Sequence, residues 1–446
     1  SVLSERPAVG QSYVLCYNKI GIFHRLIIIL IKGQFILSFL ANSAQFLLII
    51  SGILYLVLSF RGFWRIPMPP YALKKLRFAL LLPAYNEEKV IKFSVESLLK
   101  IAYPRELFDV FVVADHCTDG TAFIAADLGA AALDYSGSGL KAGKGRALKW
   151  ASDKILAMEK YDALCYFDAD SLAHPGFLEA MNNQLNAGAE AAQGRQLAKN
   201  ENCWLARILA AGHIVTNRFF QRPKQALGLS ATLHGKGMCF SASVAGRFPW
   251  DEQCLTEDLE MQMRLIRSGV RIVWAEDAIV YDEEPVNIEQ YVRRAVRWTR
   301  GSLDTARRHL LALCSRAVKK GDIRSFEGAL YCAQAYRLGL IAVTAALIWI
   351  TRDSFNLFVW LYAKLPGVEF PMKAAAMLPF ALYPAAALVM EKARPELLIA
   401  YFLQPALGIL RLPVFVAGML RGRAFWDRTE HASQVAITDL VNQEHG

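Results

Sequence analysis

Apolar and polar residues divide this chain into apolar ends and a mixed middle. Residues 36–60 contain no charged side chain over 25 positions, which is long enough to cross the hydrocarbon core of a bilayer. Three further apolar blocks follow at about 329–350, 372–390 and 397–420. The pattern therefore predicts an N-terminal segment (residues 1–75) with one membrane helix, a water-facing domain, and a C-terminal membrane region.

The middle domain, residues 76–304, is predicted to alternate strands with helices. Four short apolar runs predict buried strands at residues 78–83, 109–114, 131–133 and 162–167. Residues 89–100 carry an apolar stripe at helical spacing, and 121–129 form a second short helix. This alternation is typical of an α/β domain with a mostly parallel sheet, whose ligands bind beyond the carboxyl ends of the strands. Gly143-Lys-Gly145 matches neither the dinucleotide nor the phosphate-loop fingerprint, which argues against a dehydrogenase or a P-loop ATPase.

Carboxylates follow two of the predicted strands. Asp168 and Asp170 close the fourth strand, and two carboxylates at this spacing supply oxygen ligands for a divalent cation. A nucleotide diphosphate needs such a cation to neutralise its charge as it departs. Asp115 follows the second strand, where it either contacts a ligand or only begins the turn at residues 115–120.

Composition indicates the cellular compartment of the protein and the kinds of partner that it binds. The chain has 446 residues, of which 54% are hydrophobic, more than a purely soluble protein of this size needs. Basic residues follow the first apolar block and mark the cytoplasmic side of a membrane: Arg61, Arg65, Lys74, Lys75 and Arg77. The net charge of +10 agrees with anchoring to anionic lipid, and no nucleic-acid-binding motif is present. Eight cysteines without a repeating spacing agree with a reducing compartment. We expect a multi-pass membrane protein with a cytosolic middle domain and no nucleic-acid partner.

A series of short motifs runs through the middle domain. After Asp115 and Asp168-Ala-Asp170 come His234-Gly-Lys-Gly237, Thr256-Glu-Asp258 and Arg294-Ala-Val-Arg-Trp298. With the opening Pro83-Ala-Tyr-Asn-Glu87, they closely resemble the membrane-bound family-2 glycosyltransferases, which include the cellulose, chitin and hyaluronan synthases. The resemblance covers about residues 78–301 and the flanking membrane layout. It implies a GT-A type mixed-sheet domain that binds a UDP-sugar and extends a glycan with inversion at the cytosolic face.

The resemblance also implies roles for single residues. Seven would contact the donor: Ala84, Tyr85, Glu87, Asp115, Lys144, Asp168 and Arg297. Asp168 and Asp170 would coordinate Mn²⁺ or Mg²⁺. Arg297 and Lys144 would contact phosphates, for which guanidinium and ammonium groups are suited, although Lys144 could equally be a solvated loop charge.

The same resemblance makes Asp258 the general base, which removes the acceptor proton during attack on the sugar. Its alternative role is to stabilise a helix N-terminus electrostatically. Glu257, Arg294 and Trp298 would lie on the acceptor side. Trp298 offers a flat face for a sugar ring, although a helical Trp is often a core residue. Arg294 stands where the family usually has Gln, which separates this chain from the cellulose and hyaluronan branch.

The C-terminal part extends the resemblance. Residues 307–320 are basic and partly amphipathic, as expected of an interfacial helix within 305–328. Residues 425–431 (Phe-Trp-Asp-Arg-Thr-Glu-His) resemble an element that folds over the nucleotide site in relatives, which predicts a cytosolic tail at 421–446. An even number of crossings must then lie within 329–420. Either residues 354–365 cross the bilayer or 397–420 re-enter it.

Two other functions remain open. A lipid glycosyltransferase that adds one sugar to ceramide, diacylglycerol or a polyprenyl phosphate shares these motifs. A transporter with a regulatory nucleotide-binding domain predicts ionisable residues in the membrane blocks, for which Arg337 and Arg411 are the candidates. That reading gives Asp258 no function. The donor sugar, the linkage and the oligomeric state are not encoded in short motifs.

Overall fold

The computed structural model describes residues 9–136, 142–351, 382–420 and 433–444, with backbone only for 9–32. The chain divides into two compact units. The larger unit contains Leu54–Tyr336 and Ala375–Gly446, and the smaller contains Ser1–Ile53 and Arg337–Ala374.

The larger unit is built around one mixed sheet of eight strands. In chain order they are β1 (Phe78–Ala84), β2 (Phe108–Ala114), β3 (Ala131–Asp134), β4 (Ala163–Tyr166), β5 (Leu172–Ala173), β6 (Ala191–Ala198), β7 (Met238–Ser241) and β8 (Ile272–Asp282). Their spatial order is β3-β2-β1-β4-β7-β6-β8-β5. The four predicted strands are confirmed as β1 to β4, and they pair in parallel. β7 runs antiparallel between β4 and β6, which makes the sheet mixed.

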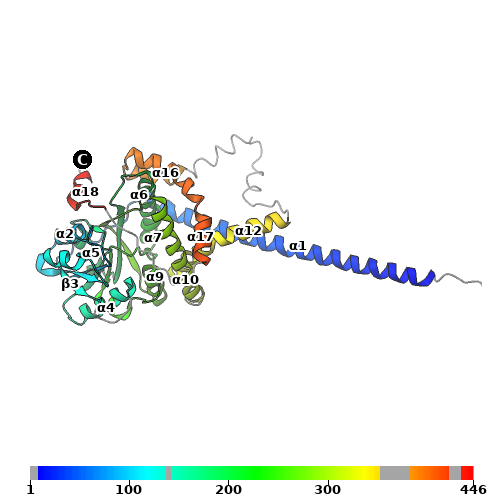
Figure 1. The fold of residues 1–446 in the computed structure, drawn as a ribbon, viewed down its shortest axis with the longest axis horizontal. Coiled ribbons are helices and arrows are strands. Elements are labelled where there is room, and N and C mark those ends of the chain that lie inside the picture. The colour runs from blue at the N-terminus through cyan, green and yellow to red at the C-terminus, as the bar shows by residue number, and fades with distance from the viewer. Residues whose placement is uncertain (1–8, 137–141, 352–381, 421–432, 445–446) are drawn as a thin grey trace, which may run out of the picture. The chain divides into compact units, whose positions relative to one another are not determined.

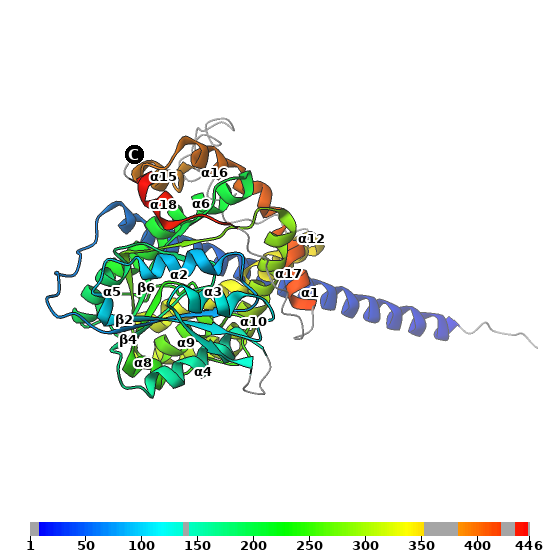
Figure 2. The same cartoon turned by 60° about the vertical axis from the view of Figure 1, so that its left-hand side comes forward.

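Helices cover both faces of this sheet (Figures 1 and 2). The helices that lie between β1 and β8 in the chain are α2 (Ile91–Leu99), α3 (Thr121–Asp127), α4 (Lys144–Leu156), α5 (Phe177–Asn186), α6 (Trp204–Thr216), η4 (Asn217–Gln221), α7 (Arg222–Ala226), α8 (Ala242–Arg247) and α9 (Glu257–Ser268). The later ones are α10 (Ile288–Lys320), α11 (Ile323–Ala333), η5 (Gln334–Tyr336), α15 (Ala385–Met390), α16 (Pro395–Gly408), α17 (Arg411–Leu420) and α18 (Ile437–Glu444). Two short turns, η1 (Phe60–Phe63) and η2 (Arg105–Leu107), precede β1 and β2.

The alternation of side chains along β1 explains why its sequence is apolar throughout. Phe78, Leu80 and Leu82 pack into one core with α2 and α5. Ala79 and Leu81 face the opposite core with α4, α8 and α9. A parallel strand with helices on both faces must be apolar on both sides, so a continuous apolar run, not an alternating one, marks it.

The strand directions bring acidic residues to one edge of the sheet. β1, β2 and β4 are parallel, β7 reverses the direction, and β6 and β8 restore it. The carboxyl ends of β2, β4 and β8 therefore lie at the same edge. Asp115 follows β2, Asp168 lies just beyond β4, and Asp282 ends β8.

The long helix α10 carries the last sequence motif and packs on the first turn of α9. It begins after Asn287, and the side chain of Asn287 accepts a hydrogen bond from the Gln290 amide (2.9 Å). It continues to Lys320, so the predicted boundary at residue 304 lies inside one helix. A Cβ at Gly301 of α10 would collide with the side chain of Thr256, which precedes the Glu-Asp pair. A glycine at this position lets α10 approach that motif closely.

Two helical segments are long and apolar enough to cross a membrane among the described residues. They are Gly33–Phe63, which includes the end of α1 (Val9–Ser59), and Ile323–Thr351, which includes α12 (Arg337–Thr351). α16 and α17 form a bent pair at 51°, which counts as a third crossing if the two form one broken span. The predicted block at 372–390 contributes only α15 to the described residues, and 354–365 lies outside them.

We predict that Gly301→Ala destabilises the protein, whereas Gly246→Ala does not. The added methyl at residue 301 overlaps Thr256, and overpacking of this kind costs about 1–3 kcal/mol. A Cβ added at Gly246 in helix α8 would lie 3.9 Å from its nearest neighbour, Leu156 Cδ1. Alanine therefore fits at this position and has a higher helix propensity than glycine. Thermal unfolding in detergent compares the two variants. Equal melting temperatures would contradict the close approach of α10 to Thr256.

Candidate active site

A cavity of about 500 Å³ opens at the acidic edge of the sheet. All twelve residues predicted from the sequence line it: Ala84, Tyr85, Glu87, Asp115, Lys144, Asp168, Asp170, Glu257, Asp258, Arg294, Arg297 and Trp298. They come from segments up to about two hundred residues apart in the sequence. Their convergence on one cavity supports treating the motifs as a single site.

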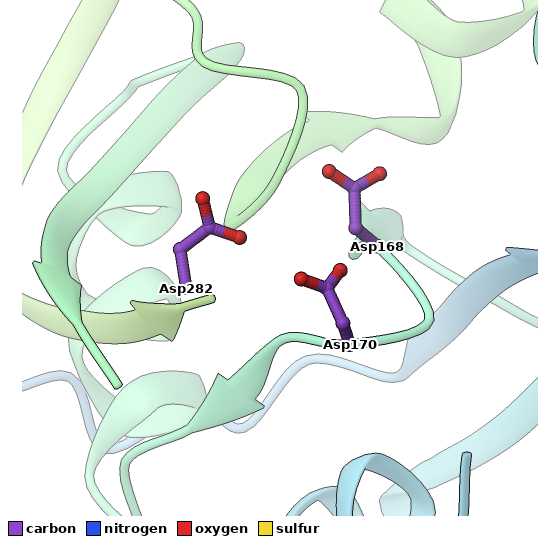
Figure 3. A group of neighbouring side chains, drawn as sticks. All are labelled: Asp168, Asp170 and Asp282. Carbon is purple, nitrogen blue, oxygen red and sulfur yellow. The ribbon is translucent and has the colours of Figure 1, made fainter. Parts of the chain in front are cut away.

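Three aspartates form a cluster that could hold a metal ion (Figure 3). Carboxylate oxygens of Asp168, Asp170 and Asp282 lie within 4.8 Å of one another. Asp168 and Asp170 share one loop, and Asp282 approaches from the end of β8. Three carboxylates form a hard oxygen donor set of the kind that Mg²⁺ and Mn²⁺ prefer. Asp282 was missed in the sequence, although it has the same signal as Asp168, an acidic residue at the end of an apolar run.

Two lysines lie among these carboxylates. Lys144, the first residue of α4, contacts Asp168 (2.6 Å) and Glu257 (2.8 Å) and so joins two motifs. Burial alone would lower the pKa of Lys144, but Asp168 and Glu257 outweigh it and raise that pKa. Lys236, from the His-Gly-Lys-Gly motif, pairs with Asp282 and lies 3.9 Å from Asp168. These contacts exclude the reading of Lys144 as a solvated loop charge.

Asp258 lies in the first turn of α9 and is buried, with 7% of its surface exposed. Burial, followed by the charge of neighbouring Glu257, raises its pKa to about 6, although Lys144 acts in the opposite direction. Gly235, with φ of +79°, passes close to it, and a Cβ there would lie 3.3 Å from Asp258 Oδ2. A carboxyl group with a pKa near neutrality can take up and release a proton under working conditions.

Arg294 belongs to a second charged network at the floor of the cavity. Its guanidinium lies 3.4 Å from Glu284 and 3.5 Å from Asp282. Glu284 in turn contacts His213 Nε2 of α6 at 2.6 Å. Burial would lower the pKa of Arg294, but Glu284 and Asp282 outweigh it and raise that pKa. No pattern in the sequence indicated His213 or Glu284, because the contact between them depends on the position of α6.

Arg297 and Trp298 present different surfaces to the cavity from adjacent positions on α10. Arg297 lines the cavity, where burial lowers the pKa of its guanidinium although the charge of nearby Glu257 acts in the opposite direction. Trp298 is 40% exposed. An indole with that exposure is not a core residue, which removes the structural alternative for this position.

Asp115 is a buried residue of the cavity lining whose carboxylate already has two partners. Its carboxylate accepts a hydrogen bond from the Gly143 amide (2.8 Å) and contacts His116 Nδ1 (2.8 Å). Its own amide donates to the Ala84 carbonyl (2.8 Å), which joins the first motif to the second. Asp115 therefore both organises the turn and lines the cavity.

The chain on the C-terminal side of the predicted tail element returns to the cavity rim. Lys199 Nζ donates to the Ser433 carbonyl (3.2 Å), and the Ser433 amide donates to Glu283 (3.1 Å), which lines the cavity. Ile437 and Leu440 of α18 pack against Leu172 and Tyr281. Residues 425–431 themselves lie outside the described residues, so their predicted role stays a prediction.

Comparison with known proteins agrees with this geometry. A family model described as "Glycosyltransferase like family 2" matches residues 76–301. The chain is 26% identical over 235 residues to "Probable glycosyltransferase YdaM" of Bacillus subtilis (51% of this chain, 55% of the relative). It is 27% identical over 198 residues to "Beta-monoglucosyldiacylglycerol synthase" of Nostoc sp. (42% and 40%). It is 23% identical over 226 residues to "Poly-beta-1,6-N-acetyl-D-glucosamine synthase" of Staphylococcus aureus (50% and 53%). The chain spans about half the length of these relatives.

A solved structure shares the fold. It is the mannosyltransferase PcManGT from Pyrobaculum calidifontis, in complex with GDP-Man and Mn²⁺. The likeness has a TM-score of 0.51 at 16% sequence identity and covers 84% of this chain and 99% of that one. At this identity the comparison establishes a GT-A-like fold and nothing about the substrate.

We predict that Asp258→Asn stabilises the protein at neutral pH. A pKa raised from its usual 3.8 to about 6 means that the folded state favours the protonated form. The carboxylate therefore lowers the free energy of unfolding above pH 6, by up to about 3 kcal/mol. This destabilisation disappears as the pH falls towards 4. Melting temperatures of wild type and variant between pH 4 and pH 8 test this.

The matched control is Glu289→Gln, in the first turn of α10, because Glu289 is an exposed carboxylate at a helix N-terminus. That variant should lose a few tenths of a kcal/mol to about 1 kcal/mol. If Asp258→Asn were also less stable than wild type at pH 8, Asp258 would be a helix-terminus residue like Glu289.

Proposed function

The chain belongs to glycosyltransferase family 2, and from this premise we propose an inverting, metal-dependent membrane enzyme that transfers sugar from a UDP-sugar to a growing glycan. The observation that carries the proposal is the presence of Asp258 in the cavity that also contains the aspartate cluster, with Lys144 paired both to Asp168 of that cluster and to Glu257, the neighbour of Asp258 in the chain. Inversion needs one base on the acceptor side and no covalent nucleophile, and Asp258 meets that need.

The donor occupies the half of the cavity formed by the first three motifs. Asp115 and the Ala84–Glu87 turn hold the uracil and ribose. Lys144 and Arg297 contact the phosphates through charge-assisted hydrogen bonds. Asp168, Asp170 and Asp282 would hold Mn²⁺ or Mg²⁺, and the bound ion would supply positive charge to offset that of the departing diphosphate. Lys144 and Lys236 then exchange carboxylate partners for phosphate partners, since an ammonium group is a mobile point charge.

The acceptor occupies the other half of the cavity. Asp258 removes the proton of the attacking hydroxyl, and its raised pKa makes it a stronger base than an exposed aspartate. Trp298 stacks on the acceptor sugar, which orients the hydroxyl for attack. Glu257 holds Lys144 in position at the boundary between the two halves (2.8 Å).

A second candidate function is transfer of a single sugar to a lipid. Relatives at 26–27% identity include beta-monoglucosyldiacylglycerol synthases, and this name states a product in which diacylglycerol carries one glucose. Arg294 in place of the glutamine of the cellulose and hyaluronan branch also favours a different acceptor. In both candidates the segments Gly33–Phe63 and Ile323–Thr351 cross the membrane and the catalytic domain faces the cytosol.

The purified full chain should transfer sugar from a UDP-sugar in the presence of Mn²⁺, and Asp258→Asn should lower the rate by about 10²–10⁴-fold while donor binding stays within severalfold. The assay incubates protein with a panel of UDP-sugars and GDP-mannose, with and without diacylglycerol, and analyses products by size and glycosidase digestion. A polymer selects the synthase, and a single glycolipid selects the second candidate.

The matched control for that experiment is Asp153→Asn, an exposed carboxylate of α4 that does not line the cavity. It should retain wild-type transfer. Near-normal turnover by Asp258→Asn would remove Asp258 as the base, and wild-type protein inactive with every donor would contradict the proposed activity.

Asp282→Asn should weaken Mn²⁺ binding by at least about tenfold, because it replaces a charged ligand of a hard cation with a neutral one. The free Mn²⁺ signal in electron paramagnetic resonance measures binding without need for turnover. Circular dichroism should confirm that the variant is folded, since Lys236 loses an ion-pair partner. An unchanged Mn²⁺ affinity in folded Asp282→Asn would restrict the metal site to Asp168 and Asp170.

A further inference from the structure

A second concentration of charge lies outside the catalytic cavity. Three arginines surround one carboxylate, that of Glu391, which directly follows α15. Arg195 Nη2 of β6 lies 2.9 Å from Glu391, and Arg218 Nη1 of η4 lies 2.5 Å from it. Arg222, the first residue of α7, lies 3.5 Å from Glu391 and pairs with Glu276 of β8. None of the three arginines lines the catalytic cavity.

The carboxylates do not saturate these guanidinium groups. In these three arginines, four buried N–H groups have no hydrogen-bond partner among the described residues: Arg195 Nε, Arg218 Nε, Arg222 Nε and Arg222 Nη1. Buried donors without partners are rare, because each loses its hydration without a replacement. Arg222 is only 6% exposed. The Nε and Nη1 groups of Arg222 therefore face no acceptor atom among the described residues, whereas its Nη2 group pairs with Glu276.

Positive charge is also in excess around Arg222. Burial, followed by the charges of Arg218, Arg195 and exposed Arg65, lowers the pKa of Arg222 to about 10, although Glu391 acts in the opposite direction. We call Arg65, Arg195, Arg218 and Arg222 the arginine cluster. Glu391 and Glu276 pair with its guanidinium groups. Burial raises the pKa of Asp277, although the charge of nearby Arg195 acts in the opposite direction. Three carboxylates thus face four guanidinium groups, which leaves a net positive charge that an anion would balance.

The arginine cluster lies beside the end of the first candidate membrane segment. That segment ends at Phe63, two residues before Arg65. η1, its last turn, packs on η4, because the rings of Phe63 and Phe219 are 5.2 Å apart and a Cβ at Gly62 would collide with the Arg218 carbonyl. Phe60, Phe63 and Trp64 are exposed. Exposed aromatic residues at the end of a span are typical of the head-group layer of a bilayer.

We propose that the arginine cluster binds the phosphate of an anionic phospholipid head group at the membrane surface. A phosphate offers several acceptor oxygens to the unpartnered N–H groups, and arginine presents a planar fork that matches phosphate geometry. Arg65 supplies the exposed point of first contact. The inference rests on the membrane placement in the proposed function and is independent of the transfer reaction.

Native mass spectrometry of the full chain in neutral detergent tests the proposal. Dioleoyl phosphatidylglycerol should bind at lower concentrations than dioleoyl phosphatidylcholine or dioleoylglycerol. Arg65→Gln should weaken phosphatidylglycerol binding by about tenfold, the usual effect of losing one charge-assisted contact. Arg247→Gln, which removes an exposed arginine of α8 far from the cluster in sequence, should bind as wild type does.

A compensated variant tests the buried members of the cluster. Arg218→Gln with Glu391→Gln removes one cation and one carboxylate together, so the net charge of the cluster is unchanged, although Arg195 also loses its ion pair with Glu391. Its binding should also fall by about tenfold. If this variant fails to fold, Arg65→Gln decides alone, because Arg65 is exposed and forms no ion pair with a described residue.

The outcomes are distinct. Equal phosphatidylglycerol binding by wild type and Arg65→Gln, or no preference over phosphatidylcholine, would overturn the assignment. Inorganic phosphate that binds as tightly as phosphatidylglycerol would mean a free-anion site and would overturn the lipid source. Carbonate extraction of membranes tests the membrane placement separately. The lipid-binding measurements need no glycosyl transfer, so failure of the proposed enzyme activity leaves them unaffected.

Discussion

Repulsion among converging carboxylates is the constraint on which the site depends. Ten carboxylates line one cavity, among them Asp168, Asp170, Glu257, Asp258 and Asp282. Two like charges 4 Å apart repel by about 4 kcal/mol even where the effective dielectric constant is 20. Lys144, Lys236 and Arg294 lie among them and offset this repulsion. Each of these cations comes from a different motif, so the motifs that form the site also hold one another in place.

The sheet topology explains how these motifs meet. Parallel strands bring their carboxyl ends to one edge, and the antiparallel strand β7 between β4 and β6 lets β8 run in the same direction as β4. Asp282 thereby reaches the loop of Asp168 and Asp170 from the opposite side (Figure 3). α10 then passes over the same edge, and Gly301 allows its close approach to Thr256. The cavity between these elements is open to a ligand, and its walls are formed by packed strands and helices. Such walls suit the alignment of a donor with an acceptor.

Arg294 links this site to the acceptor question. In this chain its guanidinium contacts Glu284 and Asp282, and Glu284 contacts His213 of α6. α6 packs against α16 through Leu205, Ile208, Ala400 and Leu407. The floor of the cavity is thus connected through one helix to the bent apolar pair α16 and α17. A substitution at this single position changes both the hydrogen-bonding character of the floor and its link to that pair.

The sequence by itself determined the α/β class, four of the eight strands, and twelve residues of the cavity, because strand ends and short motifs are local patterns that survive without knowledge of the fold. It did not identify Asp282 as the third carboxylate of the acidic cluster, Lys236 as its partner, or the His213–Glu284 contact. Those depend on which strand lies beside which, and β6 and β8 carry no pattern that specifies their neighbours. The arginine cluster is a tertiary feature for the same reason, since Arg65, Arg195 and Glu391 are separated by more than a hundred residues and meet only through packing.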